Sequence, residues 1–433
     1  MANVEHESIE LGAHLRQNHF MLSNEHNFTN NGSYGSTPKH IFNKRLQYQQ
    51  EMESAPDIWF RYTSYELWNR SIKSLTQFLS VDDEHLVLCD NATDAINAAL
   101  KSIDFVSSSQ SIKHCILANE FTYKAILNSI DYTSKYRLQQ QQQQQQQVHV
   151  EKMPLVLPIE SKQQLIDEYD RTINDIVNVK QLNLRLVVID HISSVTAILY
   201  PIRELIQVVK KYTQQHDNDP ARKCFVLIDG AHCIGHTAIE LNELGCDFYA
   251  SNLHKWFFAP RGCSFLYFRD LEHAKANLQP NFISWGYEGS LRENFFLRAT
   301  NDKTSHYLVD ECIAFHVALG GLNRIAAYCC DLVDRASEML ISEWKTEKIP
   351  IDSSVQAPFM RLIKLPDLEC YAKLDVSAKC DKLMKELMLN YKTVAVVVSI
   401  HTQCYVRISA FVYNTINDYI KLKDAILDIS INK

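Results

Sequence analysis

Short runs of apolar residues alternate with amphipathic stretches through the middle of the chain. Four runs are apolar at nearly every position: His85–Cys89, Cys115–Ala118, Leu186–Ile189 and Phe225–Ile228. Strands that helices cover on both faces have this pattern, so each run predicts a buried strand. Segments with helical periodicity follow three of them, at Asp94–Ile103, Tyr123–Ile130 and Ile202–Tyr212. The alternation predicts an α/β fold with a mostly parallel sheet.

The pattern changes after about residue 300. Thr304–Trp344 has the period of a long helix and is interrupted by Gly320 and Gly321. A strand, a helix, two further strands and a last helix are expected to follow, at Phe359–Leu365, Ala378–Leu389, Val394–Ile400, Tyr405–Phe411 and Asn417–Ile429. Elements in this order are typical of a second, smaller α+β domain.

We therefore expect three parts: an N-terminal arm over residues 1–45, a large domain over residues 46–300, and a small domain over residues 301–433. The large domain contains an uninterrupted glutamine run at residues 139–147. This run has no apolar residue to bury, so it predicts an exposed loop insertion. An interaction through the glutamines is possible in principle, but a tolerated expansion is the favoured interpretation.

Charge and cysteine usage exclude several kinds of partner. The net charge is −7 and no long Lys/Arg cluster is present, which excludes nucleic acid and an anionic membrane surface as partners. The acidic N-terminus shows no targeting signal, and no stretch has the length of a transmembrane helix. Twelve cysteines without paired spacing favour reduced core thiols over disulfides or a zinc site. We expect a cytoplasmic protein without a structural metal.

Two of the predicted strands end in an aspartate, at Asp190 and Asp229. Ligands gather at the carboxyl ends of parallel strands, but an acid there is also common as a helix cap or a surface charge. Asp229 stands out because it opens the sequence DGAH, and Lys255 follows after one predicted helix and one predicted strand.

Lys255 has unusual surroundings for a lysine. It lies between His254 and Trp256 in a stretch that is rich in Phe, Trp and Ala. Desolvation in such a setting lowers the pKa of an ammonium, as a Schiff-base lysine requires. A carboxylate against the ring nitrogen of pyridoxal phosphate keeps that nitrogen protonated. Lys255 and Asp229 therefore predict a pyridoxal-phosphate site in which Lys255 carries the cofactor.

A candidate phosphate site follows the first predicted strand. The residues Asp90-Asn91-Ala92-Thr93 open a predicted helix, and free backbone N–H groups at a helix start bind anions. By itself this segment is equally consistent with an ordinary helix cap.

Six stretches together resemble the class V aminotransferase family of fold-type I pyridoxal-phosphate enzymes, in its isopenicillin N epimerase-like and cysteine desulfhydrase-like branch. They are NNGSYGSTP (30–38), DNATDAINAAL (90–100), DHISSVTAILYPI (190–202), LIDGAHCIGH (227–236), SNLHKWFFAPRG (251–262) and VRISAFVYN (406–414). They span nearly the whole chain in the family's order, and the lysine segment with DGAH is the most specific. The resemblance implies a large domain with a mostly parallel sheet of the seven-stranded type, flanked by helices, and a smaller C-terminal domain.

The resemblance also implies a role for individual residues. Lys255 would carry the cofactor and move the proton at the substrate Cα, while Asp229 would pair with the ring nitrogen. His232 would approach the phenolic oxygen, with Ser194 a second candidate for that contact. Four residues would surround the phosphate: Ala92, Thr93, Asn252 and His254.

Four further residues follow from the same resemblance. Tyr123 would stack on the ring, although an aromatic there suits core packing equally well. Arg407 would hold the substrate α-carboxylate in a bidentate pair, and Asn31 of the N-terminal arm would line the substrate pocket. Where relatives carry Gly-Thr-Arg-Asp, this chain has Ala299-Thr300-Asn301-Asp302. In the family that segment reaches the phosphate of a neighbouring subunit, which implies a homodimer and makes Thr300 a further candidate.

The reaction is less constrained than the cofactor, because one fold supports several chemistries. A persulfide-forming desulfurase needs an exposed cysteine on a mobile loop, and no cysteine lies in such a sequence. An epimerase needs a second acid/base, for which Tyr123 is the one candidate. Elimination needs only Lys255 and a good leaving group, which favours a carbon–sulfur lyase acting on cysteine or a cysteine conjugate. Epimerisation, transamination and an inactive scaffold remain alternatives, and the intact Lys255, Asp229 and Arg407 argue against the scaffold.

Overall fold

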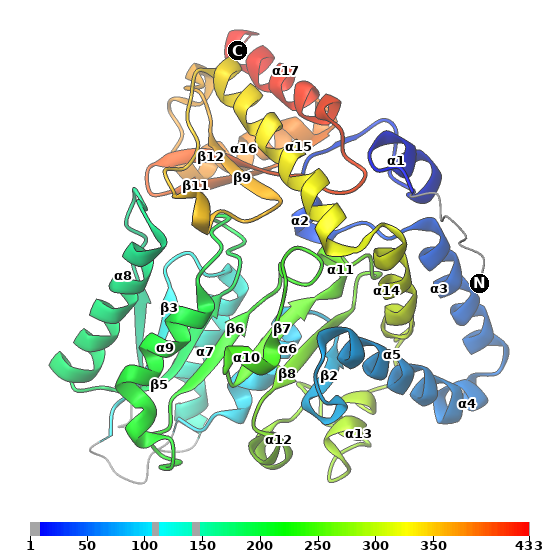
Figure 1. Ribbon diagram of the computed structural model, residues 1–433, viewed down its shortest axis with the longest axis vertical. Coiled ribbons are helices and arrows are strands. Elements are labelled where there is room, and N and C mark those ends of the chain that lie inside the picture. Colours follow the sequence, from blue (N-terminus) through cyan, green and yellow to red (C-terminus); the bar gives the residue numbers. More distant parts are fainter. Residues whose placement is uncertain (1–8, 106–111, 141–147, 433) are drawn as a thin grey trace, which may run out of the picture.

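Two main β-sheets of different size, besides a short two-stranded one, organise the described chain in the computed structural model (Figure 1). The structure describes residues 9–105, 112–140 and 148–432, so most of the glutamine run lies outside the described residues. The larger sheet comes from the middle of the sequence and the smaller one from the C-terminal part.

The large sheet has seven strands in the order β2-β8-β7-β6-β5-β3-β4. Their bounds are β2 (Leu86–Cys89), β3 (His114–Asn119), β4 (His149–Met153), β5 (Asn183–Asp190), β6 (Phe225–Asp229), β7 (Phe248–Asn252) and β8 (Ser264–Phe268). Strand β8 runs antiparallel to both of its neighbours, β2 and β7, whereas β3 to β7 pair in parallel. The mostly parallel sheet that the sequence predicts is confirmed.

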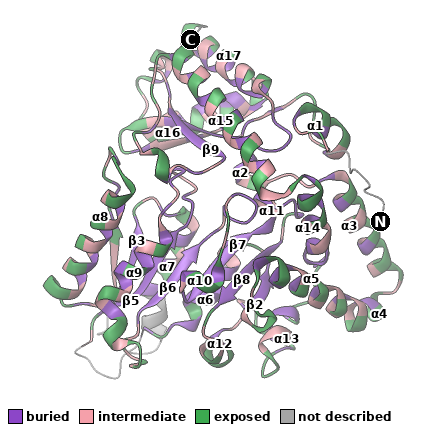
Figure 2. Cartoon of the chain, viewed as in Figure 1, coloured by how far each residue is buried: buried purple, intermediate pink, exposed green. Residues whose placement is uncertain are grey.

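Helices flank this sheet, as buried parallel strands require (Figure 1). They are α5 (Ser64–Leu79), α6 (Ala92–Ser102), α7 (Lys124–Gln140), α8 (Lys162–Asn174), α9 (Ile202–Thr213), α10 (Leu241–Leu244), α11 (Leu253–Trp256), α12 (Leu271–Asn277) and α13 (Leu291–Phe296). All side chains of β3, β6, β7 and β8 are buried, and Figure 2 shows the sheet as the purple centre of the molecule.

The C-terminal part forms an antiparallel sheet of three strands in the order β11-β12-β9. Its elements are β9 (Met360–Lys364), β11 (Val396–Ile400), β12 (Gln403–Ser409), α15 (Gly321–Trp344), α16 (Val376–Leu389) and α17 (Ile416–Asn432). Helix α15 packs against β9 and α17, and α16 packs against β11. Helix α14 (Val309–Ala318) precedes α15 and packs on α5.

The N-terminal arm joins these two regions. It contains α1 (Ala13–His19), β1 (Asn27–Phe28), α2 (Asn31–Tyr34) and the start of α3 (Lys39–Ser54), and the short α4 (Pro56–Ile58) follows. Strand β1 pairs in parallel with β10 (Thr393–Val394), and the Arg16 guanidinium lies 3.0 Å from Asp418 of α17. The arm is therefore anchored to the C-terminal part.

Several expected elements differ in detail from the observed ones. The predicted strand Val394–Ile400 is split, because Val394 belongs to β10, which pairs with the arm, while β11 begins at Val396. The long helical segment is broken at Gly320 and Gly321, both of which have positive φ. Strand β4 is absent from the prediction, since three of the five residues in its sequence HVEKM are polar; it lies at the sheet edge.

All twelve cysteines are free thiols, and nine of them are buried. Among the described residues, no group of three or more His, Cys, Asp and Glu side chains is arranged to hold a metal ion. No single helix of the described chain is long and apolar enough to cross a membrane, although the pair His306–Ala318 and Gly321–Trp344, bent by 66°, meets the same length and composition test jointly.

Candidate active site

A cavity of about 460 Å³ lies where the carboxyl ends of β5, β6 and β7 meet the start of α6. Its walls contain most of the residues singled out from the sequence: Ala92, Thr93, Tyr123, Ser194, Asp229, His232, Asn252, His254 and Lys255. The parallel sheet explains this convergence, because strand ends that are far apart in sequence lie side by side at one edge. We call this cavity the lysine pocket.

Lys255 lies on the single turn of α11, directly after β7. Its Nζ is 2.9 Å from Nε2 of His232. Burial, reinforced by the nearby Arg407 cation, lowers the pKa of Lys255 to about 7. A large fraction of the side chain is therefore a neutral amine near pH 7, the form that attacks a carbonyl carbon.

The hydrogen bonds of His232 support the same protonation state. The indole N–H of Trp256 donates to Nδ1 of His232 at 3.3 Å, so the neutral ring carries its proton on Nε2. That proton points toward Lys255 Nζ, which can accept it only as a neutral amine. Burial first, and Lys255 second, hold the pKa of His232 well below its usual range.

Asp229 and Asp190 end two adjacent strands and are register partners. Both are buried, and Asp229 accepts a hydrogen bond from the Ala231 N–H at 3.0 Å. Asp190 accepts one from the Thr122 hydroxyl at 2.6 Å. Burial raises the pKa of both carboxyl groups, that of Asp190 to about 7 with a further contribution from Asp229. The site thus holds acidic groups that need a cationic partner to stay ionised.

The start of α6 closes one end of the lysine pocket. Asn91 caps this helix through the Asp94 N–H, and the Asn252 side-chain oxygen accepts the Ala92 N–H at 2.8 Å. Thr93 lies in the first turn and lines the cavity. An eleven-residue helix that points its N-terminus into a pocket favours an anionic group there.

Arg407 reaches the site from β12 of the C-terminal sheet. Its guanidinium is buried and donates to the backbone and side chain of Ser194. It also donates to Asn30 Oδ1 at 2.9 Å and to the Ser33 hydroxyl at 3.1 Å. Within the part of the chain that the structure describes, its Nε has no hydrogen-bond partner and no carboxylate forms an ion pair with it. A buried cation without a counter-charge favours binding of an anion.

Two residues expected in the site lie elsewhere. Asn31 is buried below the lysine pocket, where it donates to the Lys255 carbonyl at 2.9 Å and accepts from the Tyr413 hydroxyl at 3.0 Å. It lines a neighbouring cavity and not the lysine pocket. Thr300 is exposed and lines neither cavity of this chain.

Three residues of the site were not predicted from the sequence. Asn30 and Ser33 contact Arg407, and Tyr34 lines the lysine pocket with Ser33. All three lie in the NNGSYGSTP stretch. The motif therefore indicated that this stretch contributes to the site, but the prediction named Asn31 alone. Asp190 was noted as a strand end and also lines the pocket.

A glycine seats the arm on the lysine segment. Gly35 has φ +63°, and a Cβ built there would lie 1.7 Å from the backbone oxygen of His254. No side chain fits this contact, so the arm approaches Lys255 closely only because residue 35 is glycine.

These residues fit pyridoxal phosphate. The neutral Lys255 amine could bond to the aldehyde carbon of the cofactor, and the buried Asp229 carboxylate could pair with its ring nitrogen. The start of α6 could bind its phosphate. The unpaired Arg407 guanidinium suits the carboxylate of an amino acid.

Known proteins share both the sequence and the fold. The family Aminotransferase class-V matches residues 60–340. The hercynylcysteine sulfoxide lyase of Schizosaccharomyces pombe is 23% identical over 96% of this chain and 97% of its own. The L-cysteine desulfhydrase of Arabidopsis thaliana is 25% identical over 92% of this chain and 87% of its own.

A cysteine desulfurase structure from Thermococcus onnurineus NA1 superposes with a TM-score of 0.70, at 16% identity, over 98% of this chain and 99% of its own. This likeness confirms the fold-type I architecture. The chain therefore belongs to the class-V aminotransferase family, and its cofactor is pyridoxal 5′-phosphate.

Proposed function

We propose that this enzyme is a carbon–sulfur lyase that breaks the Cβ–S bond of L-cysteine or of an S-substituted cysteine. The observation that carries the proposal is the 2.9 Å contact between Lys255 Nζ and His232, in a pocket where a buried arginine lacks a carboxylate partner. An amine that is neutral near pH 7 can take a proton from Cα, and elimination needs no second base. The names of the two relatives, a desulfhydrase and a lyase, support this choice.

Each residue would contribute a separate part of the reaction. When bound, pyridoxal phosphate supplies an electron-withdrawing ring conjugated to Cα of the amino acid. Asp229 would keep the ring nitrogen protonated, and the start of α6 with Asn252 and His254 would bind the phosphate. Arg407 would bind the α-carboxylate, and Lys255 would receive the Cα proton and later deliver it. His232 and Ser194 would contact the phenolic oxygen.

Epimerisation is the second candidate, because Tyr123 lines the lysine pocket and is 49% exposed. A tyrosine hydroxyl that reached Cα from the face opposite Lys255 could return the proton with inversion. The same exposed ring could instead stack on the cofactor, which would leave Lys255 as the one base.

We further propose that the enzyme acts as a homodimer in the cytoplasm. The segment from Phe282 to Tyr287 carries four exposed apolar side chains, among them Trp285 at 94% exposure. Aromatic groups gathered in this way favour an interface between copies of the chain. Thr300 also lies exposed, as a contact to a neighbouring subunit's phosphate would require. The twelve free thiols suit a reducing compartment.

The first test is the visible absorption spectrum of the purified protein before and after L-cysteine is added, with sulfide and pyruvate assayed in the same sample. A yellow band that shifts, together with equal yields of sulfide and pyruvate, supports elimination. Formation of D-cysteine with solvent deuterium at Cα, and without pyruvate, would replace elimination by epimerisation. Conversion to a keto acid that retains sulfur would instead indicate transamination.

A further inference from the structure

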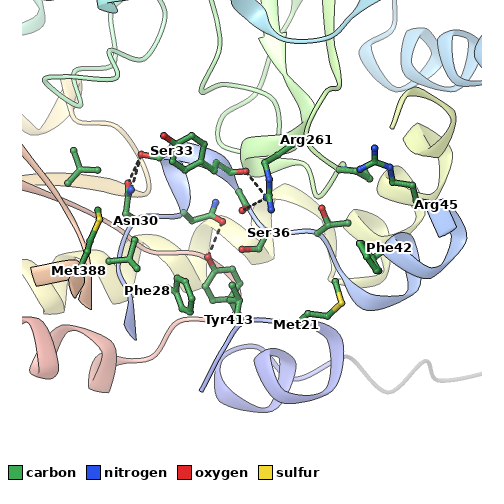
Figure 3. A pocket seen from close by; sticks show the side chains of 18 of the residues that line it. Met21, Phe28, Asn30, Ser33, Ser36, Phe42, Arg45, Arg261, Met388 and Tyr413 are labelled. Carbon is green, nitrogen blue, oxygen red and sulfur yellow. Dashed lines mark hydrogen bonds between the residues drawn. The ribbon is translucent and has the colours of Figure 1, made fainter. Parts of the chain in front are cut away.

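A second cavity, of about 840 Å³, lies on the other side of α2 from the lysine pocket. Figure 3 shows its labelled residues, which come from the N-terminal arm, the segment after Lys255 and the C-terminal part. Its apolar walls include Met21, Leu22, Phe28, Phe42, Met384 and Met388. We call it the arm cavity.

The two cavities share one wall. Ser33 and Tyr34 line both, and Ser33 also accepts a hydrogen bond from Arg407. The Tyr34 side chain is 72% exposed, so it stands at the rim between the cavities and does not fill either. The arm cavity is therefore adjacent to the place where Arg407 and Lys255 would bind an amino acid.

The size of the arm cavity exceeds what cysteine needs. Cavities for small ligands typically measure about 300–1,000 Å³, with apolar walls and a few placed polar groups. The cofactor and the amino acid would lie in the lysine pocket, which measures about 460 Å³ and is separate from the arm cavity. Thioether side chains such as Met384 and Met388 adapt to varied apolar shapes, which suits a bulky substituent.

The charged residues of the arm cavity are both arginines. No aspartate or glutamate is among its described lining residues. Arg45 is paired with Asp302 at 3.5 Å, whereas Arg261 is exposed and donates only to the backbone oxygens of Tyr34 and Gly35, at 3.4 and 3.3 Å, in the described chain. The free guanidinium donors of Arg261 favour an anionic end on the ligand and disfavour a cationic one.

We infer that the arm cavity binds the sulfur substituent of an S-substituted cysteine, an aromatic or aliphatic group that ends in an anion near Arg261. The inference rests on the proposed lyase function and specifies its substrate class. In the reaction, the Cα proton passes to Lys255, and the Cβ–S bond breaks with its electron pair leaving on sulfur. The sulfur is released as a thiol, and the three-carbon fragment takes up one water and leaves as pyruvate and ammonium.

The test compares L-cysteine, S-phenyl-L-cysteine and S-(4-carboxyphenyl)-L-cysteine in the holoenzyme, with kcat/KM measured by pyruvate release. Met388→Trp narrows the cavity, and Leu389→Trp is its matched control on the next position of α16, exposed and outside the cavity. We expect Met388→Trp to lower the ratio of kcat/KM for S-phenylcysteine to that for cysteine at least tenfold. The control should leave this ratio within about twofold, as for a surface substitution.

Arg261→Gln tests the anionic end. It should lower kcat/KM for the carboxyphenyl substrate about tenfold relative to that for the phenyl substrate, because one charge-assisted hydrogen bond is lost. Ratios that stay unchanged in both Met388→Trp and Arg261→Gln would overturn the inference. So would a change in oligomeric mass caused by Met388→Trp, because a second copy of the chain would then be the occupant.

Failure of the lyase proposal gives a different result. In that case the wild-type enzyme would release no pyruvate from any of the three substrates. Titration of the cofactor absorption band with each amino acid then gives its dissociation constant. The ratio of the dissociation constants for S-phenylcysteine and cysteine replaces the ratio of kcat/KM values. The substituent site would stand if Met388→Trp weakened binding of S-phenylcysteine selectively, and would be rejected otherwise.

Discussion

The two cavities on either side of α2 differ in how the chain builds them. The lysine pocket gathers charged and polar side chains at strand ends of the large sheet, and burial changes the pKa of Lys255, Asp229 and Asp190. The arm cavity is nearly twice as large and is walled by apolar side chains of the arm and the C-terminal part. The comparison indicates that the sheet supplies the chemistry, whereas the arm and the C-terminal part select what the chemistry acts on.

Removal of the Lys255 side chain should have the largest effect on turnover, and this effect should arise in the lysine pocket alone. We expect Lys255→Ala to lower turnover at least about a thousandfold, because the proton acceptor at Cα is lost. The yellow band of the purified protein should disappear as well. Added methylamine should restore part of the turnover, whereas a variant that stayed yellow and active would contradict the assignment of Lys255.

A substitution of Arg407 tests how the C-terminal part contributes to the lysine pocket, because Arg407 lies on β12 and its side chain reaches that pocket. We expect Arg407→Lys to raise KM for L-cysteine about 10- to 100-fold with a smaller change in kcat. The lysine ammonium keeps the charge but cannot form the two parallel hydrogen bonds that a planar guanidinium makes with a carboxylate. Arg361→Lys is the matched control, because Arg361 is buried on the neighbouring strand β9 but pairs with Asp334 at 2.8 Å. Equal changes in KM for the two variants would mean that Arg407 is only structural.

The lowered pKa of Lys255 gives a test that needs no substitution. The neutral amine captures the cofactor, and its fraction falls tenfold for each pH unit below the pKa. In protein freed of cofactor, the rate of band formation should therefore rise with pH up to about 7 and level off above it. A rate that continued to rise beyond pH 9 would indicate a solvated lysine and a pocket that does not desolvate it.

The sequence predicted the sheet and its edge better than the pocket's other walls. Asp229 and Lys255 could be paired because each follows a short buried strand, and parallel strands bring their ends together by rule. Asn30 and Ser33 could not be assigned, since their contact with Arg407 joins residues 377 and 374 positions apart. No local pattern encodes such a contact, and Asn31 was chosen although its amide is used by Lys255 and Tyr413.

The strand order and the position of the arm could not be predicted from the sequence either. Strand β1 has two residues and pairs with β10, another strand of two residues, so neither gives a periodic signal. The helix break at Gly320 and Gly321 was visible because glycine interrupts a pattern that is otherwise regular over many turns. Long regular elements are thus predictable, and short pairings that depend on distant partners are not.

The contact between arm and lysine segment gives the smallest expected effect and bears on both cavities. Gly35→Ala places a methyl group against the His254 carbonyl, at a residue whose φ of +63° already disfavours a side chain. Gly321→Ala is the matched control, because Gly321 has φ +71° but nothing lies within 4 Å of a built Cβ. Both variants carry the backbone strain of roughly 1 kcal/mol, and only Gly35→Ala adds the clash.

We expect the melting temperature of Gly35→Ala to fall by several degrees more than that of Gly321→Ala. The hydrogen bond from Asn31 to the Lys255 carbonyl should weaken as well, because Asn31 begins the short helix α2 and Gly35 ends it, four positions later. The cofactor band should then shift in Gly35→Ala alone. Equal melting temperatures and unshifted bands in both variants would mean that the arm can move away from α11 freely. The lysine pocket and the arm cavity would then be independent, and selectivity for a sulfur substituent could not depend on the arm.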